Sequence, residues 1–565
     1  MEKNQIILET MKNHSLDSKN ISFATVSGIV STNPGMIKRI DALPDFSLIT
    51  TKSYQVNPNP GNREPVIVEP EAGSFGNAVG LRNSGMMKGL EELKKLTTQE
   101  TLSSILNISV SGNSIEEFIT LIRHFEGIAD IIELNLSCPH AAGGYGMAIG
   151  TDPEVVYSYL SEIRKVTDAL LFPKLTPNVD SISEIALAAV QGGADGITAI
   201  NTAGPKLYIE PVSGKPLLMN KSGNRGGMSG RWVKNLAIEK VSEIRKALGP
   251  DIPIIGMGGI ETGEDVRNMM RAGADIVGIG SLFASIHPDD WNSFFPALKK
   301  DAFNNSDTAS TYRSTEKKME YVPHTITGIT DLPGDARVME LDGEISFKAG
   351  QFVFLCIPGT GEKPFAVMKG SPPSFLVKKK GAFTSRIMEL EVGMQIFVRG
   401  VYGKDSPDTD KKNVLISAGG TGLATALKLA EKLKNKGKEI HTYYGMSSPG
   451  QELMKDDFLQ YGTFTAAADN GVPGRIVDTL ISDLDKNTPA DDFALYTIGP
   501  DPFMEKTAQD FIKAGGRAEN IFLSLETPTR CGVGLCGECE CGGHLTCREG
   551  TFFSYAYLQE LHDEN

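Results

Sequence analysis

Apolar runs and amphipathic segments alternate along the first three hundred residues. Eight short runs are nearly all apolar, as expected for strands of a parallel sheet that is buried on both faces. Helical patterns lie between many of them, as in Ser114–Phe125, Pro153–Thr167 and Arg231–Leu248. The eight predicted strands are Ile21–Gly28, Phe46–Ser53, Leu102–Val110, Ile131–Ser137, Leu171–Pro177, Gly196–Thr202, Ile252–Gly259 and Asp275–Ser281.

Eight strands alternating with helices over this length predict a (β/α)8 TIM barrel of the α/β class. The alternative is a doubly wound open sheet, and the number of strands favours the barrel. We therefore expect residues 1–303 to form one barrel domain.

The pattern changes after residue 303. Residues 304–318 (NNSDTASTYRSTEKK) are polar and predict a linker. Short β-type runs and glycine turns over 319–408 predict a small antiparallel β-barrel, and 409–523 return to the strand–helix order of a nucleotide-binding α/β domain. Residues 524–565 contain most of the cysteines and form the last predicted domain.

Length and charge narrow the function classes. A chain of 565 residues is too long for one hydrophobic core. The net charge of −14, without a long basic block, argues against nucleic acid and anionic membranes as partners. No apolar run of about 18 residues predicts a membrane span, and Met1–Asn20 lacks the apolar core of a signal peptide, so we expect a cytoplasmic protein.

Five of the seven cysteines crowd one short stretch, while Cys356 and Cys138 stand alone. A C-x4-C-x2-C run followed by one more cysteine matches the plant-type spacing of a 2Fe–2S cluster. Zinc is the alternative, although this spacing is unusual for zinc. The predicted cluster ligands are Cys531, Cys536, Cys539 and Cys547, and Cys541 is expected to be a non-ligand.

Polar residues end several of the predicted barrel strands. Cys138 lies in ELNLSCPH at the end of the fourth, where such barrels carry their active sites. A thiol there could act as a general base, although most lone cysteines are small buried hydrophobes. Two inward lysines are costly unless they meet an anion, such as a reduced flavin or a carboxylate substrate. Four other polar residues at strand ends favour a catalytic role for Cys138, namely Lys52, Lys174, Asn135 and Asn201.

Glycine-rich turns follow the last three predicted strands. They are GGMSG at Gly226–Gly230, GMGG at Gly256–Gly259 and GIGS at Gly278–Ser281. The last two turns of a barrel commonly bind phosphate through backbone N–H groups. Together these turns predict a cofactor that carries a phosphate.

The region from Ser22 to Leu282 resembles the class 1 dihydroorotate dehydrogenases, through TTKS, FGNAVGLRN, NLSCP, KLTPN, INT, GGMSG and GMGG with GIGS. The resemblance implies an FMN-binding barrel, a pyrimidine substrate, a homodimer formed through the barrel, and Cys138 as the base. The implied substrate-binding residues are Lys52, Asn77, Gly80, Leu81, Asn135, Asn201 and Thr202. The implied FMN-binding residues are Ser27, Gly28, Lys52, Asn107, Asn135, Lys174, Gly230, Gly258, Gly259, Gly280 and Ser281.

His140 departs from this family, whose members usually carry asparagine at that place. CPH with KLTPNV is similar to the dihydropyrimidine dehydrogenases, while NAVGLRN (Asn77–Asn83) is similar to the dihydroorotate enzymes. We expect His140 to tune the choice of substrate or to relay the proton that Cys138 removes. A lid residue that faces solvent is the alternative.

The stretch Tyr321–Phe553 resembles the FAD- and 2Fe–2S-containing electron-transfer subunit of the NAD-linked dihydroorotate dehydrogenases. The shared motifs are AGQFVFL, KPFAV, GAFTSRI, AGGTGLA and YTIGPDPFM. Three positions depart from the family: Lys363 and Ala366 replace the arginine and the serine of the usual RPxS motif, and Ile498 replaces the cysteine of the CGP turn. The implied cofactor-binding residues are Lys363, Pro364, Phe365, Gly381, Thr384, Gly420, Thr421 and Gly422.

Both resemblances together imply a catalytic barrel fused to its own ferredoxin-reductase-like module. The expected reaction is oxidation of dihydroorotate at FMN, with electrons passing through the 2Fe–2S cluster and FAD to NAD+, as in pyrimidine biosynthesis. Fusion holds both parts at high effective concentration. One alternative is an NAD(P)H-dependent dihydropyrimidine dehydrogenase or other ene-reductase. Another is an electron-transfer protein whose barrel is a docking scaffold without catalysis.

Overall fold

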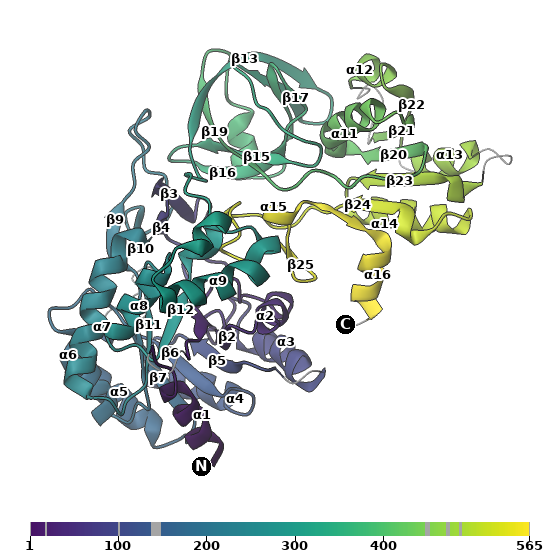
Figure 1. Ribbon diagram of the computed structural model, residues 1–565. Helices are drawn as coiled ribbons and strands as arrows, with labels where there is room; N and C mark the ends of the chain where they lie inside the picture. Colours follow the sequence, from purple (N-terminus) through teal and green to yellow (C-terminus); the bar gives the residue numbers. More distant parts are fainter. Residues whose placement is uncertain are drawn as a thin grey trace. The chain divides into compact units, whose positions relative to one another are not determined.

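The computed structural model describes residues 2–16, 20–99, 102–136, 149–446, 453–469, 475–484 and 489–563, and it divides into two compact units (Figure 1). The barrel unit comprises Met1–Glu320 together with Val533–Leu545. The second unit comprises Tyr321–Gly532 together with Thr546–Asn565. The cysteine-rich segment is therefore divided between the two units.

Eight parallel strands close into a barrel in the order β1-β12-β11-β8-β7-β6-β5-β2, which confirms the predicted barrel. Each predicted strand overlaps one of them, and β7 begins one residue earlier than predicted. The strands are β1 (Phe23–Thr25), β2 (Phe46–Thr50), β5 (Ile105–Val110), β6 (Ile131–Asn135), β7 (Leu170–Leu175), β8 (Ile197–Ala199), β11 (Ile254–Met257) and β12 (Ile276–Ile279).

Helices cover the outside of the barrel (Figure 1). They are α2 (Pro34–Asp41), α3 (Met86–Gln99), α4 (Ile115–Phe125), α5 (Pro153–Arg164), α6 (Ile182–Gln191), α7 (Lys234–Leu248), α8 (Gly263–Arg271) and α9 (Trp291–Asn304). The α4 helix begins where Ser114 caps it by accepting a hydrogen bond from the Glu117 N–H group at 3.3 Å. Its buried face carries Phe118, Leu121 and Ile122.

The amino-terminal end of the barrel is closed by apolar side chains. Ile131 and Leu170, the first residues of β6 and β7, pack in one buried cluster with Ile7 and Met11 of α1 (Glu2–Lys12). This packing leaves the opposite end, where the strands finish, as the end that carries polar groups.

A four-stranded antiparallel sheet was not predicted from the sequence. It pairs β3 (Ile67–Glu71) and β4 (Ser74–Asn77) with β10 (Arg225–Gly230) and β9 (Ala203–Leu207). Its strands come from the segments that follow β2 and β8. Two of the predicted site residues, Asn77 and Gly230, therefore lie at the ends of neighbouring strands of this sheet.

Residues 304–318, predicted as a linker, contact the last barrel helix. The wholly buried carboxylate of Asp301 accepts hydrogen bonds from the Ser306 and Thr308 hydroxyl groups and from the Ala309 N–H group. Ala309 is buried in the short 3-10 helix Thr308–Tyr312.

The second unit begins with an antiparallel sheet of seven strands, in the order β16-β15-β19-β13-β14-β18-β17. Its strands share an apolar core that includes Ile326, Val353 and Phe375. The elements are β13 (Val322–Leu332), β14 (Ala336–Leu341), β15 (Phe352–Ile357), β16 (Gly361–Ala366), β17 (Lys369–Gly370), β18 (Pro373–Lys378), α10 (Ala382–Ile387) and β19 (Gln395–Tyr402).

The rest of the second unit is built on a six-stranded sheet in the order β22-β21-β20-β23-β24-β27, parallel except for β27. Because β21 and β22 lie on one side of β20 and β23 and β24 on the other, the strand order reverses between β20 and β23. Nucleotides bind at such switch points in open α/β sheets. The elements are β20 (Asn413–Gly419), α11 (Leu423–Asn435), β21 (Glu439–Met446), α12 (Lys455–Leu459), β22 (Gly462–Ala468), α13 (Arg475–Asp483), β23 (Phe493–Ile498), α14 (Asp501–Lys513), β24 (Ile521–Ser524), α15 (Thr546–Glu549), β27 (Phe552–Ser554) and α16 (Tyr555–Asp563).

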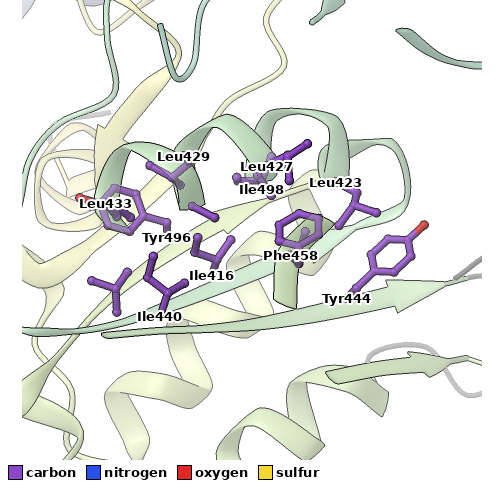
Figure 2. Packing of buried hydrophobic residues seen from close by; sticks show 14 of the residues in the cluster. Ile416, Leu423, Leu427, Leu429, Leu433, Ile440, Tyr444, Phe458, Tyr496 and Ile498 are labelled. Carbon is purple, nitrogen blue, oxygen red and sulfur yellow. The ribbon is translucent and has the colours of Figure 1, made fainter. Parts of the chain in front are cut away.

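Helix α11 covers one face of this sheet (Figure 2). Leu423, Leu427 and Leu433 point from the helix toward strand residues such as Ile416 and Tyr496, and all of them belong to one buried cluster. This packing places the glycine turn at the start of the helix beside the carboxyl ends of β20 and β23. Within the described residues, no helix is both long enough and apolar enough to cross a membrane.

Candidate active site

The carboxyl ends of neighbouring barrel strands bring several predicted site residues together. Asn135 ends β6 and pairs in register with Lys174 on β7. On the other side of β6, Glu133 pairs with Ser109 of β5. Side chains from β5, β6 and β7 therefore share one patch of the barrel interior.

A chain of hydrogen bonds crosses this patch. The Ser27 hydroxyl lies 2.9 Å from the Ser53 hydroxyl, which lies 2.9 Å from that of Ser109. Ser109 donates to Glu133 Oε1 at 2.9 Å. Asn135 Nδ2 donates to Ser53 Oγ at 3.1 Å, so residues after β1 and β2 and residues of β5 and β6 join in one network.

Asn201, which follows β8, extends the network. Its Nδ2 donates to Asn135 Oδ1 at 3.3 Å, and its Oδ1 accepts from the Thr202 N–H group at 2.8 Å. The two asparagines predicted to hold the substrate are thus in direct contact.

Both predicted lysines lie in this region. Lys174 is buried, and its Nζ lies 3.7 Å from Glu133 Oε1. A methyl group added to Gly28 would lie 2.9 Å from Lys52 Nζ, so the lysine ammonium group packs against the Gly28 backbone. A buried ammonium group needs an anionic partner, and Glu133 supplies one for Lys174.

Three residues of the barrel strands each carry one of the buried polar atoms that have no hydrogen-bond partner in the described part of the chain. These atoms are Asn107 Oδ1, Thr198 Oγ1 and Glu133 Oε2. Thr198 pairs in register with Lys174, and Asn107 Nδ2 is held by the Thr50 hydroxyl at 3.1 Å. Buried polar atoms without partners are rare, and they indicate a place for a polar ligand or water. The carbonyl and N–H groups of the FMN ring fit this set, since they can both donate and accept.

The predicted glycine turn Gly226–Gly230 is wrong, because these residues form most of strand β10 through pairing with β4 and β9, whereas Gly258–Gly259 and Gly280–Ser281 follow β11 and β12 as predicted. Gly230 has a φ of 76°, and a Cβ there would lie 2.2 Å from the Gly73 carbonyl oxygen. Gly259 has a φ of 69°, and a Cβ there would lie 2.8 Å from the Gly230 carbonyl oxygen. Only glycine allows so close an approach of backbones, which suits a site built from bare N–H groups. The remaining predicted members of these turns are Gly258, Gly280 and Ser281, which follow β11 and β12.

Other predicted substrate residues lie on and after β4. Asn77 Nδ2 donates to the Gly227 carbonyl at 3.3 Å. Gly80 and Leu81 both have positive φ, and Asn59 donates to the Gly80 carbonyl at 3.1 Å. The predicted base Cys138 and its neighbour His140 belong to residues 137–148, which lie outside the described residues.

Sequence reasoning missed Ser53, Ser109 and Glu133. Ser109 and Glu133 are polar residues inside otherwise apolar strands, each two positions from a predicted site residue. Because side chains of a strand alternate between its faces, that spacing places them on the same face as Asn107 and Asn135. This signal was available in the sequence.

The predicted cofactor residues of the second unit fall in three places. Lys363, Pro364 and Phe365 lie on β16, with Lys363 exposed. The Thr384 hydroxyl accepts from the Lys380 and Gly381 N–H groups, at 2.8 and 3.0 Å, where α10 begins. Gly420, Thr421 and Gly422 form a single 3-10 turn between β20 and α11.

That turn lies at the switch point of the six-stranded sheet. A Cβ on Gly422 would lie 2.5 Å from the carbonyl oxygen of Ile498, the last residue of β23. At this turn Gly420 is exposed and Thr421 is half-buried, whereas Gly422 is buried where the two strand ends approach each other. This arrangement suits the binding of a nucleotide phosphate.

The four predicted cluster ligands, Cys531, Cys536, Cys539 and Cys547, are all buried. Among the residues that the structure describes, no three His, Cys, Asp or Glu side chains are grouped as a metal site. Two of the cysteines have their backbone carbonyls held within the second unit. The Gly403 N–H group donates to the Cys547 carbonyl at 2.9 Å, and Arg399 Nη1 donates to the Cys531 carbonyl at 2.9 Å.

Comparisons with known proteins agree with the site in the barrel. Residues 11–291 match the dihydroorotate dehydrogenase family. The chain is 42% identical over 267 residues to a protein of Methanocaldococcus jannaschii named dihydroorotate dehydrogenase B (NAD(+)), catalytic subunit, a match that covers 47% of this chain and 84% of that protein. Proteins with the same name from Methanothermobacter thermautotrophicus and Pyrococcus abyssi are 38% and 41% identical over 284 and 255 residues. These matches cover 50% and 45% of this chain and 89% and 81% of those proteins. The chain belongs to the dihydroorotate dehydrogenase family.

Proposed function

We propose that this chain oxidises dihydroorotate to orotate at FMN bound in the carboxyl-terminal mouth of the barrel. The observation that carries the proposal is the polar network at the strand ends, in which Asn135, Asn201 and Lys174 come together in a family of dihydroorotate dehydrogenases. The names of the relatives support the same reaction.

Different residues at the mouth of the barrel would bind the cofactor and the substrate. FMN, when bound, supplies the acceptor for the hydride that the substrate loses. Asn107 and Lys174 would hold the flavin ring, and the turns at Gly258–Gly259 and Gly280–Ser281 would hold its phosphate. Asn135 and Asn201 would bind the pyrimidine, because each amide offers both a donor and an acceptor to its N–H and C=O groups.

Charge and proton transfer fall to two further residues. Lys52 would offset negative charge that develops on the bound ligands, since its ammonium group packs at Gly28 beside Ser27. Cys138 would take the proton from the substrate carbon next to the one that loses hydride.

We further propose that the second unit passes the electrons to NAD+. Residues Lys363–Phe365, Gly381 and Thr384 would hold FAD, and the Gly420–Gly422 turn at the switch point would hold a nucleotide phosphate. Cys531, Cys536, Cys539 and Cys547 would hold a 2Fe–2S cluster, which is supported by their spacing and burial.

The second candidate function is that of a dihydropyrimidine dehydrogenase, which acts on a related pyrimidine. His140 favours it, because this chain shares the CPH motif with the dihydropyrimidine dehydrogenases. The two candidates are separated by steady-state assays of the full chain. We expect reduction of NAD+ with dihydroorotate, together with equal amounts of FMN and FAD and two irons per chain. Reduction of uracil by NAD(P)H without any activity on dihydroorotate would reject the first candidate. A single flavin, or zinc in place of iron, would reject the proposed electron path.

A further inference from the structure

Glu133 is the most unusual residue of the barrel interior. It lies on the apolar strand β6, and its side chain is fully buried, with a relative exposure of 0%. Oε1 accepts a hydrogen bond from Ser109 at 2.9 Å and lies 3.7 Å from Lys174 Nζ. Oε2 has no hydrogen-bond partner among the residues that the structure describes.

The fold gains little from such a carboxylate. Removing a charge from water is costly, and a 3.7 Å separation is too long for a direct hydrogen bond to the ammonium group. Apolar residues in place of a buried ion pair are often neutral or stabilising. What Glu133 contributes must therefore be sought in the groups it contacts.

Glu133 fixes the direction of the serine chain. A hydroxyl group has one proton to donate, and Ser109 donates its proton to Glu133. In the contact between Ser53 and Ser109, Ser53 must therefore be the donor. Since Ser53 then has no second proton, Ser27 must donate in the contact between Ser27 and Ser53.

The hydrogen-bond network continues from Ser53 to the two asparagines. The oxygen of Ser53 accepts from Ser27 and from Asn135 Nδ2, which uses both of its lone pairs. Because the nitrogen of the Asn135 amide faces Ser53, its oxygen faces Asn201 and accepts from Asn201 Nδ2. The carboxylate thus anchors the serine chain to which the Asn135 amide is bonded, and Asn135 in turn is bonded to Asn201.

We propose that Glu133 is a positioning residue of the active site, which orients the Asn135 and Asn201 amides through the serine chain and holds Lys174 by its charge. This inference rests on the proposed function, because it assigns the two amides to the pyrimidine and Lys174 to the flavin. Glu133 acts through the groups that it contacts, because its Oε1 accepts from Ser109 and lies beside Lys174.

The test uses the full chain with its bound flavins and reads two quantities. The first is the Kd of orotate, from the change in flavin absorbance on titration. The second is the midpoint potential of the flavin that responds to orotate, measured by chemical reduction against a reference dye.

Glu133→Gln keeps the shape of the side chain but removes its charge, so the charge-assisted hydrogen bond that anchors Ser109 is lost and only a weaker, neutral one can replace it. We expect orotate to bind at least tenfold more weakly. Without the carboxylate, Lys174 favours the anionic reduced flavin more strongly, so the ratio of reduced to oxidised flavin at fixed potential should rise about tenfold, or about 30 mV for two electrons. Glu133→Asp retains the charge and should restore the potential.

Ser109→Ala separates the two contacts. It breaks the serine chain but leaves the carboxylate beside Lys174, so it should weaken orotate binding without moving the potential. The matched control is Asp301→Asn, which changes a wholly buried carboxylate of α9 that is bonded to Ser306 and Thr308, and it should alter neither quantity.

Wild-type values of both quantities in Glu133→Gln would overturn the inference. Should that variant fail to fold, wild-type orotate affinity in Ser109→Ala would overturn it instead. Failure of the proposed function looks different: wild-type flavin would then not be reduced by dihydroorotate, while the effect of Glu133→Gln on the potential could still be measured with a chemical reductant.

Discussion

A buried ion pair in the second unit offers a sharp test of how that unit is held together. Arg399 on β19 and Glu362 on β16 are both fully buried, with Nη2 to Oε1 at 2.5 Å and Nε to Oε2 at 2.8 Å. The guanidinium carbon lies 3.7 Å from the centre of the Phe354 ring. Tyr321 donates to Glu362 Oε2 at 2.9 Å. Burial lowers the pKa of Arg399, but the charge and hydrogen bond of Glu362 together with Tyr402 and Tyr321 raise it well above its usual range, so the guanidinium stays charged.

Glu362→Gln leaves that buried charge without its counterion. Removing one partner of a buried pair costs about 3–5 kcal/mol. If β15 and β19 exchange their amide hydrogens by opening of this sheet, a loss of that size speeds exchange on the order of a hundredfold or more, since about 1.4 kcal/mol is tenfold. Replacing both partners, as in Glu362→Leu with Arg399→Leu, should recover much of the loss because no charge then remains buried.

Hydrogen exchange read by mass spectrometry measures this effect segment by segment. Peptides from β15 and β19 should lose protection in Glu362→Gln, while peptides from the barrel strand β6 should exchange as in the wild type. Unchanged protection of β15 and β19 in the single variant would refute the argument that the pair is needed to neutralise a buried charge. A double variant that is less protected than the single one would refute the argument about charge burial.

Four further variants and one alkylation measurement test other parts of the molecule. Cys138→Ser should keep FMN but slow its reduction by substrate, with partial recovery at high pH, because a hydroxyl is a weaker base than a thiol of pKa about 8.5; reduction at the wild-type rate would contradict this. Cys541→Ser should retain iron while Cys536→Ser loses it, and equal iron in both would contradict the ligand assignment. Burial and the nearby Glu540 charge raise the pKa of Cys541 to about 11, so its alkylation should rise about tenfold per pH unit above pH 8, and a plateau near pH 8.5 would contradict this. Gly422→Ala should impair the reduction of NAD+ but not that of an artificial acceptor, because the added Cβ would lie 2.5 Å from the Ile498 carbonyl oxygen and distort the turn. A normal KM for NAD+ in this variant would argue against a nucleotide at the turn.

The barrel could be predicted because its signal is local. Each buried parallel strand is a short apolar run, and Ser114 before α4 shows directly where that helix begins. The sheet of β3, β4, β9 and β10 could not be predicted in the same way. Its strands come from segments more than one hundred residues apart, and glycine-rich runs such as Arg225–Gly230 lack the alternation of apolar and polar residues that marks a strand.

The residues of the site could be predicted from the sequence better than the hydrogen bonds that connect them. Lys174, Asn135 and Asn201 could be selected because each is a polar residue at the end of an apolar strand. Their link through Ser53 and Glu133 depends on the register of β5, β6 and β7 in the closed barrel, which no single segment encodes. Long-range register of this kind is fixed by packing of the whole barrel.

Oxidation of dihydroorotate in the barrel can be measured as single-turnover bleaching of the flavin. The full chain is mixed anaerobically with dihydroorotate or with dihydrouracil, without NAD+, and flavin absorbance is followed. We expect rapid bleaching by dihydroorotate and much slower bleaching by dihydrouracil. Bleaching by dihydrouracil alone would move the enzyme to the dihydropyrimidine dehydrogenases, and a flavin that neither compound reduces would contradict catalysis in the barrel altogether.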